Sequence, residues 1–201
     1  SHRTLDSRQE SLRLTQVREQ GGVTSLVDVR QAEQLVYEAS SEITTLEREI
    51  VSCRRCPRLV AWREQVAREK RASFEDEVYW GRPVPGFGDP EAGVVVLGLA
   101  PAAHGANRTG RFFTGDRSGD FLFASLHRTG FANKPVSRSK GDGLRLSGLW
   151  ISAAVRCAPP QNRPTPAERD ACLPYAAREL ELLDTKIIVC LRDGPRRFSE
   201  L

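Results

Sequence analysis

The chain has 201 residues, which is enough for one globular domain with an appendage and too short for two ordinary domains. Hydrophobic residues make up 39% and charged residues 28%, a balance typical of a water-soluble protein with a real core. Apolar runs such as Val94 to Leu97 are far shorter than the roughly 20 residues of a membrane helix, and no stretch near residue 1 resembles a secretory signal. We therefore expect a cytoplasmic protein with no membrane span.

Charge is distributed unevenly along the chain. Residues 1–50 carry 6 Arg and 9 acidic side chains, a net charge of −3, whereas residues 51–201 carry 24 basic and 17 acidic side chains, a net charge of +7. Of the 30 basic residues 26 are Arg, whose forked guanidinium binds phosphate better than Lys does. The composition fits a phosphate-binding surface, and it equally fits a genomic preference for Arg codons on a solvated surface.

The first 40 residues are polar and lack a sustained apolar face. Gly21-Gly22 divides this stretch, and only Val23 to Val29 has strand character. We therefore expect residues 1–45 to be a weakly structured N-terminal extension and residues 46–201 to form the globular domain.

Two helices are expected before the first strand. Thr44 and Glu47 have the spacing of a capping box, which predicts a helix that starts there, turns Leu46 and Ile50 inward and ends at the cysteines that follow. Pro57 is suited to the first position of a second helix, which runs to about residue 70. The Gly- and Pro-rich residues 80–90 predict a loop.

Strands and helices then alternate. Gly93 to Leu99 is apolar and β-branched, as in a strand buried on both faces of a parallel sheet, and Trp150 to Val155 and Lys186 to Leu191 follow the same pattern. Between them we expect a helix over residues 118–128, with Phe121, Leu122, Ser125 and Leu126 facing inward, and a helix from the capping box at Thr165 to residue 183. This order predicts an α/β fold with a parallel sheet and right-handed crossovers.

Four of the five cysteines fall into two pairs, Cys53 with Cys56 and Cys157 with Cys172, while Cys190 is expected to be a core residue of the third strand. Without a secretory signal, metal ligation explains the C-x2-C pair better than a disulfide. Four thiolates suit either zinc or an iron–sulfur cluster, and spacing alone slightly favours zinc. The alternative is that Cys157 and Cys172 are unrelated buried thiols.

The loop after the first strand, residues 98–116, is the expected ligand site, because open α/β sheets bind ligands beyond the carboxyl ends of their strands. It lacks the G-x-G-x-x-G fingerprint of dinucleotide sites. Its small residues let a flat ligand approach the backbone, while His104, Asn107 and Asp116 supply polar edges and Phe112 or Phe113 a stacking face. This combination predicts a pocket for a base swung out of a nucleic acid. The alternative for Asp116 is a helix cap, and for Asn107 a turn-shaping role.

Several motifs together resemble those of the family 5 (type b) uracil-DNA glycosylases, and the resemblance covers about residues 46–191. The motifs are Cys53-x2-Cys56-Pro-Arg-Leu, Trp80-Gly-Arg-Pro-Val-Pro-Gly-Phe-Gly-Asp89, Gly98-Leu-Ala-Pro-Ala-Ala-His-Gly-Ala-Asn-Arg-Thr-Gly-Arg111, Phe113-Thr-Gly-Asp116 and Ala154-Val-Arg-Cys157-Ala-Pro-Pro. The resemblance implies a three-layer α/β/α fold with a parallel central sheet and hydrolysis of the N-glycosidic bond of uracil and related deaminated bases in DNA. It also implies a monomer with a [4Fe-4S] cluster held by Cys53, Cys56, Cys157 and Cys172, which overrides the preference for zinc.

The resemblance also assigns site residues. Gly98 opens the first catalytic motif, and Ala100 stands where other glycosylase families place a water-activating Asp or Asn, which leaves Asn107 and Asp116 as candidates for positioning the water. Phe113 matches the position that stacks on uracil. Ala153 replaces a uracil-reading Asn, which goes with broader base tolerance. Further substrate-binding residues are expected in the same loop: Pro101, Ala102, His104, Arg111 and Gly115.

The sequence departs from the family pattern near its end. In the family, a second catalytic motif centred on His-x-Ser lies downstream of the third strand. Here the residues after Leu191 diverge, and no His follows His127. We therefore expect a chain truncated at its C-terminus, without the last strand or strands and with little or no excision activity as printed; the absence of Met also indicates non-native boundaries. The alternative function is a non-catalytic iron–sulfur or zinc DNA-binding remnant.

Overall fold

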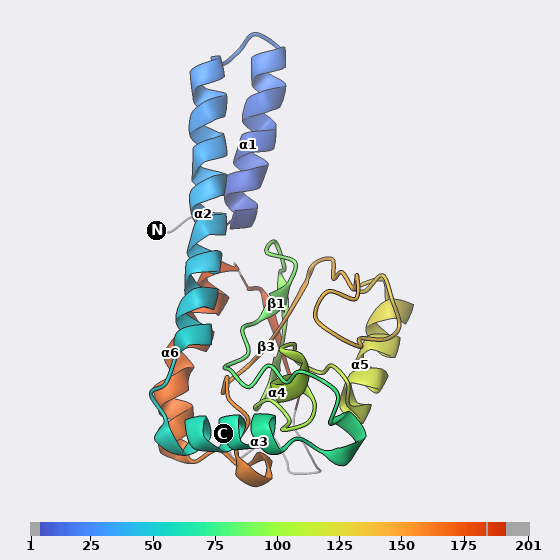
Figure 1. Ribbon diagram of the computed structural model, residues 1–201. Coiled ribbons are helices and arrows are strands. Elements are labelled where there is room, and N and C mark those ends of the chain that lie inside the picture. Colours follow the sequence, from blue (N-terminus) through green and yellow to red (C-terminus); the bar gives the residue numbers. More distant parts are fainter. Residues whose placement is uncertain (1–4, 184, 192–201) are drawn as a thin grey trace.

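The computed structural model describes residues 5–183 and 185–191, and its centre is a sheet with the strand order β1-β3-β2-β4 (Figure 1). The strands are β1 (Phe87–Gly88), β2 (Val94–Gly98), β3 (Leu149–Ala153) and β4 (Ile187–Cys190). Strand β2 pairs in parallel with β3 and β4, which confirms the three predicted strands. The sheet is nevertheless mixed, because the loop expected over residues 80–90 contains β1, which pairs antiparallel with β3.

The strand register separates two faces of the sheet. Val95 lies opposite Trp150, and Val96 lies opposite Ile151. Successive side chains point to opposite faces of a strand, so the two pairs lie on different sides. Phe123 of α5 (Arg117–Arg128) packs in one cluster with Val96 and Ile151.

The second face is covered by α2 (Leu26–Ser52) and α6 (Pro166–Leu182). Ile43 of α2 and Leu183, the C-cap of α6, cluster with Val95 and Trp150. Figure 1 shows α5 on the side of the sheet away from these two helices. The three-layer α/β/α arrangement is therefore confirmed for the described residues.

The predicted starts of two helices are confirmed. Helix α3 (Pro57–Glu69) has proline at its first position, and α6 has the reciprocal capping box of Thr165 and Glu168. A short helix, α4 (Ala106–Thr109), interrupts the loop after β2, which the sequence did not indicate. Among the described residues, no helix is both long enough and apolar enough to cross a membrane.

The N-terminal residues differ from the prediction. Helix α1 (Leu5–Gln20) and α2 form a hairpin that extends beyond the sheet (Figure 1), so the expectation of weak structure before residue 45 is wrong for the residues described. Helix α2 starts at Ser25, whose hydroxyl and backbone exchange hydrogen bonds with Asp28, and Thr44 lies inside the helix. Because α2 passes through residues 45 and 46 without a break, no element ends at the predicted domain boundary, and the division into two parts stays a prediction.

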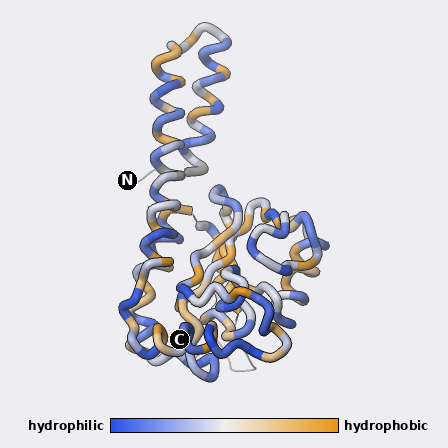
Figure 2. The backbone as a smooth tube through the Cα atoms, viewed as in Figure 1, coloured by the Kyte–Doolittle hydropathy of each residue, from blue (hydrophilic) through white to orange (hydrophobic). Residues whose placement is uncertain are grey.

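Helix α2 is held by an apolar stripe that continues into the core. Its buried positions recur three, four or eleven residues apart, which are all spacings of one helix face: Val29, Ala32, Ile43, Leu46 and Ile50. Leu46 and Ile50 are buried as predicted, and the helix ends at Cys53 as predicted. Figure 2 shows hydrophobic residues concentrated in the strands and alternating with polar ones along the hairpin, as expected of a helix with one buried side.

Two inward-facing assignments were wrong. Phe121 is 76% exposed, and Phe123, two positions later, is fully buried against the sheet. Cys190 was expected in the core but is exposed. Strand β4 lies at the edge of the described sheet, and no described residues bury its side chains. In both cases the type of element was predicted correctly and the buried face was not.

Candidate functional site

A cavity of about 410 Å³ lies beyond the carboxyl ends of β2 and β3. The register pairs Gly98, the last residue of β2, with Ala153, the last of β3, and the Ala154 N–H donates to the Gly98 carbonyl at 2.9 Å. Seven of the predicted site residues line the cavity: Gly98, Ala100, Pro101, Ala102, Phe113, Asp116 and Ala153. The side chains of Leu122 and Leu191, which sequence reasoning did not assign to the site, also line it.

Phe113 is held against the strand ends by two glycines. Its φ of 51° is unusual for a residue with a side chain, and such strain typically costs about 1–3 kcal/mol. A Cβ at Gly98 would lie 3.0 Å from Cζ of the Phe113 ring, and a Cβ at Gly119 would overlap the Phe113 carbonyl. The ring therefore rests on the backbone of Gly98 and forms one wall of the cavity.

Asp116 has two roles in the structure. Its Oδ1 accepts a hydrogen bond of 2.8 Å from the Gly119 N–H, so it is the N-cap of α5 as the alternative interpretation held. Its Oδ2 faces Gly105, where a Cβ would lie only 2.4 Å away. Asp116 also lines the cavity, so the cap brings a carboxylate to the place where a base would be received.

Asn107 is placed outside the cavity lining. It is fully buried in α4, and its Nδ2 donates to the backbone carbonyl of Arg63 in α3 at 3.2 Å. Its Oδ1 accepts no hydrogen bond from the described residues. The side chain therefore ties α4 to α3, one step removed from the cavity wall at Ala106.

Three further predicted residues also lie outside the lining. His104 bonds through Nδ1 to the Tyr79 hydroxyl at 3.0 Å, and burial, together with nearby cations, lowers its pKa, which favours the neutral imidazole. Arg111 is 7% exposed and forms an ion pair of 2.7 Å with Asp142, so its role is internal support. Gly115 forms a turn with φ of 73°.

The four paired cysteines line a second, smaller cavity where the turn between α2 and α3 meets α6. None of the four forms a disulfide. The Arg63 Nη1 donates to Cys157 Sγ at 3.0 Å, and the Arg156 backbone N–H approaches Cys172 Sγ at 3.3 Å. Hydrogen bonds of this kind stabilise a thiolate, so Cys53, Cys56, Cys157 and Cys172 fit a group that takes four thiolate ligands.

Burial opposes ionisation of these thiols before anything binds them. It raises the pKa of Cys157 to about 11, even though Arg63 acts in the other direction, and it also raises the pKa of Cys56 and Cys172. Ligation would therefore release protons. Within the described part of the chain, no three His, Cys, Asp or Glu side chains are arranged to hold a single metal ion.

A buried ion pair that the sequence did not reveal lies beside the cavity of the thiols, which Arg156 also lines. Arg156, 1% exposed, pairs with Glu179 of α6 at 2.6 Å. Glu179 also accepts hydrogen bonds from the Ser152 hydroxyl and the Gly86 N–H. Because Arg156 directly precedes Cys157, the pair fixes the chain between the end of β3 and the thiols. Its partners are distant in sequence, so only the fold brings them together.

Comparison with known proteins gives consistent matches. A family model described as the uracil DNA glycosylase superfamily matches residues 85–199. The chain is 57% identical over 148 residues to a type-5 uracil-DNA glycosylase of Mycobacterium tuberculosis, which is 74% of this chain and 55% of the relative. Type-5 uracil-DNA glycosylases of Thermus thermophilus and Pyrobaculum aerophilum are 58% and 50% identical over 71% of the chain and over 64% and 62% of their own lengths. The chain thus spans somewhat more than half of the length of these relatives.

Proposed function

The chain belongs to the uracil-DNA glycosylase superfamily, and we propose that its cavity beyond β2 and β3 receives a uracil swung out of DNA, whose N-glycosidic bond is then hydrolysed. The observation that carries this proposal is the meeting of Phe113, Gly98 and Asp116 at one cavity, where an aromatic face, a close backbone and a carboxylate adjoin. The proposed partner is DNA that contains uracil or other deaminated bases, and the proposed setting is a monomer in the cytoplasm, where the DNA of a bacterial cell lies.

The reaction replaces the bond between the sugar and the base with a bond between the sugar and a water oxygen, and it moves one proton from the water to the base. A water oxygen bonds to C1′ of the sugar, the C1′–N1 bond breaks with its electron pair going to the base, and the water loses a proton while the base gains one. Positive charge develops on the sugar and negative charge on the base, so a nearby carboxylate and backbone N–H donors would each stabilise the transition state. Unstacking the base costs a few kcal/mol, and less at a mismatched U·G pair.

The methyl side chain of Ala100 has no polar atom that could orient the water, so Asp116 is the residue proposed to do so. Asp116 lines the cavity and has its Oδ1 fixed by the Gly119 N–H. Asn107 is the second candidate and is supported less, because its amide nitrogen is bonded to Arg63 outside the lining. Phe113 would stack on the base. Ala153 has no side-chain amide, so the hydrogen-bonding edge of the base would be recognised less strictly.

We further propose that Cys53, Cys56, Cys157 and Cys172 hold a [4Fe-4S] cluster, which when bound supplies a structural crosslink between the α2–α3 turn and α6. Four thiols around one cavity support this, as do the donors from Arg63 and Arg156. Zinc is the alternative, because four thiolates suit either group. Anaerobic purification followed by iron, sulfide and zinc analysis tests this, and a colourless zinc protein would contradict it.

The function is tested by measuring binding and base release on the same duplexes. We expect tighter binding to a U·G duplex than to a C·G duplex, with the difference lost in Phe113→Ala. The second motif expected after Leu191 would fall outside the described residues. Equal, salt-dependent binding to both duplexes without base release would favour the non-catalytic remnant.

A further inference from the structure

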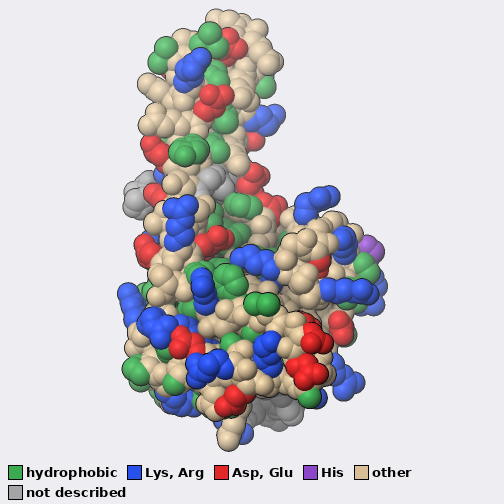
Figure 3. Space-filling model, viewed as in Figure 1, with side chains coloured by type: hydrophobic (Ala, Val, Ile, Leu, Met, Phe, Trp, Pro, Cys, Tyr) green, Lys and Arg blue, Asp and Glu red, His purple; other side chains and the backbone are tan. Residues whose placement is uncertain are grey.

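A larger cleft, which shares no lining residue with the base cavity, lies between α2, α3 and the loop after Glu77. Its volume is about 770 Å³, and we call it the α2–α3 cleft. Six cations line it: Arg48, Arg54, Arg63, Arg68, Arg82 and Lys140. Only two carboxylates do so, Glu47 and Glu64. Figure 3 shows basic side chains gathered over this lower part of the molecule.

The carboxylates do not balance the cations. Glu64 forms ion pairs with Arg54 at 2.5 Å and with Arg63 at 3.9 Å. Glu47 is partly buried, and this burial raises its pKa while Lys140 lowers it, so Glu47 balances at most one of the remaining cations. Four cations of the cleft form no ion pair with any described residue: Arg48, Arg68, Arg82 and Lys140. The cleft therefore has a surplus of positive charge that the protein itself leaves uncompensated.

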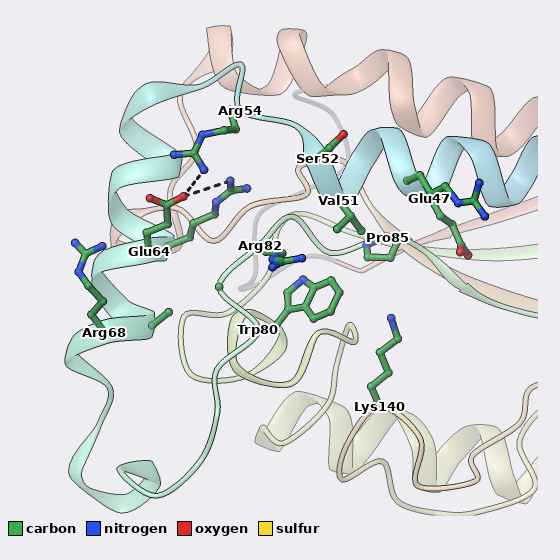
Figure 4. A pocket seen from close by; sticks show the side chains of 14 residues that line it. Glu47, Val51, Ser52, Arg54, Glu64, Arg68, Trp80, Arg82, Pro85 and Lys140 are labelled. Carbon is green, nitrogen blue, oxygen red and sulfur yellow. Dashed lines mark hydrogen bonds and ion pairs between the residues drawn. The ribbon is translucent and has the colours of Figure 1, made fainter.

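Trp80 contacts two of these cations. Lys140 Nζ lies 4.7 Å and Arg82 Cζ 5.9 Å from the centre of the Trp80 ring. The ring itself is fixed, because its Nε1 donates to the Pro83 carbonyl at 3.0 Å and its carbon atoms pack on Gly110. Figure 4 shows both cationic ends beside the indole. The ring thus holds both cations at the cleft without an ion pair among the described residues, where phosphate oxygens could pair with them.

We propose that the α2–α3 cleft binds a nucleic-acid strand through its phosphates, at a site separate from the base cavity. Arginine predominates among the cleft's cations, and its guanidinium binds phosphate oxygens in a bidentate manner. Figure 4 shows the labelled cations spread across the cleft from Arg68 to Lys140 rather than converging on one point, which fits successive phosphates of a strand better than one free phosphate. That the strand is DNA rests on the proposed function.

The test measures binding of a labelled DNA oligonucleotide of about 16 nucleotides without uracil, as a function of salt. Each single-strand phosphate contact contributes about 0.7 to the slope of log K against log salt, so Arg82→Ala/Lys140→Ala should lower the slope by about 1.4 and weaken binding about tenfold. Both side chains are exposed, so the variant should fold. Arg18→Ala/Arg30→Ala removes the same charge from exposed hairpin positions and should change affinity by less than about twofold.

Three results would overturn the proposal. The first is that the cleft variant binds the oligonucleotide as tightly as the wild type does. The second is that the hairpin variant loses as much affinity as the cleft variant. The third is that inorganic triphosphate binds in a way that depends on Arg82 and Lys140 while the oligonucleotide does not bind. The last result would assign the cleft to free polyphosphate. Phe113→Ala separates this proposal from the proposed function, because it should remove the preference for uracil and leave binding of the uracil-free strand unchanged.

Discussion

The ion pair of Arg156 and Glu179 allows a sharp test of how the core is held. Glu179 accepts four hydrogen bonds: 2.6 and 3.2 Å from the Arg156 guanidinium, 2.5 Å from the Ser152 hydroxyl and 3.1 Å from the Gly86 N–H. Both partners of the ion pair are at least 95% buried. Glu179→Ala would leave the Arg156 charge in the core without its counter-charge, which typically costs about 3–5 kcal/mol. That is a large part of the roughly 5–15 kcal/mol by which a domain is stable.

The measurement is urea unfolding followed by circular dichroism, with metal content held constant across variants. Glu181→Ala is the matched control, because Glu181 is exposed on the same helix and should change the free energy of unfolding by less than about 0.5 kcal/mol. Arg156→Met should cost as much as Glu179→Ala, and the double variant should cost less than the sum by about 2 kcal/mol, because no lone charge remains. If Glu179→Ala cost less than about 1 kcal/mol, the pair would not be the central polar support of the core.

Three further predictions concern the cavities and the loop that supports them. Gly98→Ala places a Cβ 3.0 Å from the Phe113 ring, so the preference for uracil in duplex binding should fall and the free energy of unfolding should drop by about 1–3 kcal/mol. An unchanged preference would show that the position of the ring does not matter. The pKa of Asp142 is lowered, because the Arg111 ion pair and backbone N–H groups outweigh the effect of its burial. The ionised carboxylate therefore stabilises the fold above the unfolded pKa of about 4, and this stabilisation is lost as the pH falls below that value. Asp142→Asn should be less stable than the wild type at pH 7 and should lose less further stability in acid, which urea midpoints at pH 7 and at acidic pH would show. Cys157→Ser should lose bound iron, whereas the exposed Cys190→Ser should keep it, and equal iron contents would contradict the ligand assignment.

Local patterns in the sequence predicted the elements that local forces determine. The apolar runs at β2, β3 and β4 identified strands because burial on two faces requires such runs, and the box of Thr165 and Glu168 fixed the start of α6. The hairpin was missed because α1 has scarcely any apolar side of its own. The stripe of α2 becomes readable only when positions from Val29 to Ile50 are followed across the whole helix.

Polar residues of the site were harder to assign, because their roles depend on partners far away in sequence. Asn107, Arg111 and Asp116 stand within ten residues of one another and all suit a ligand pocket by chemistry. Their partners differ. Asn107 donates to the Arg63 carbonyl, and Arg111 forms an ion pair with Asp142. Of the three, only Asp116 lines the cavity. No periodicity in the sequence encodes such long-range pairings.

Helix α3 links the thiols to the base cavity. It begins directly after Cys56. The guanidinium of its Arg63 donates to Cys157 Sγ and to the Cys53 carbonyl, and the backbone carbonyl of Arg63 accepts a hydrogen bond from Asn107 of α4. Helix α4 in turn supplies Ala106 to the cavity wall. A displacement of α3 after loss of the proposed crosslink would therefore be transmitted to that wall. A cysteine variant such as Cys157→Ser should for this reason lose preference for uracil together with iron, although no thiol touches the base cavity.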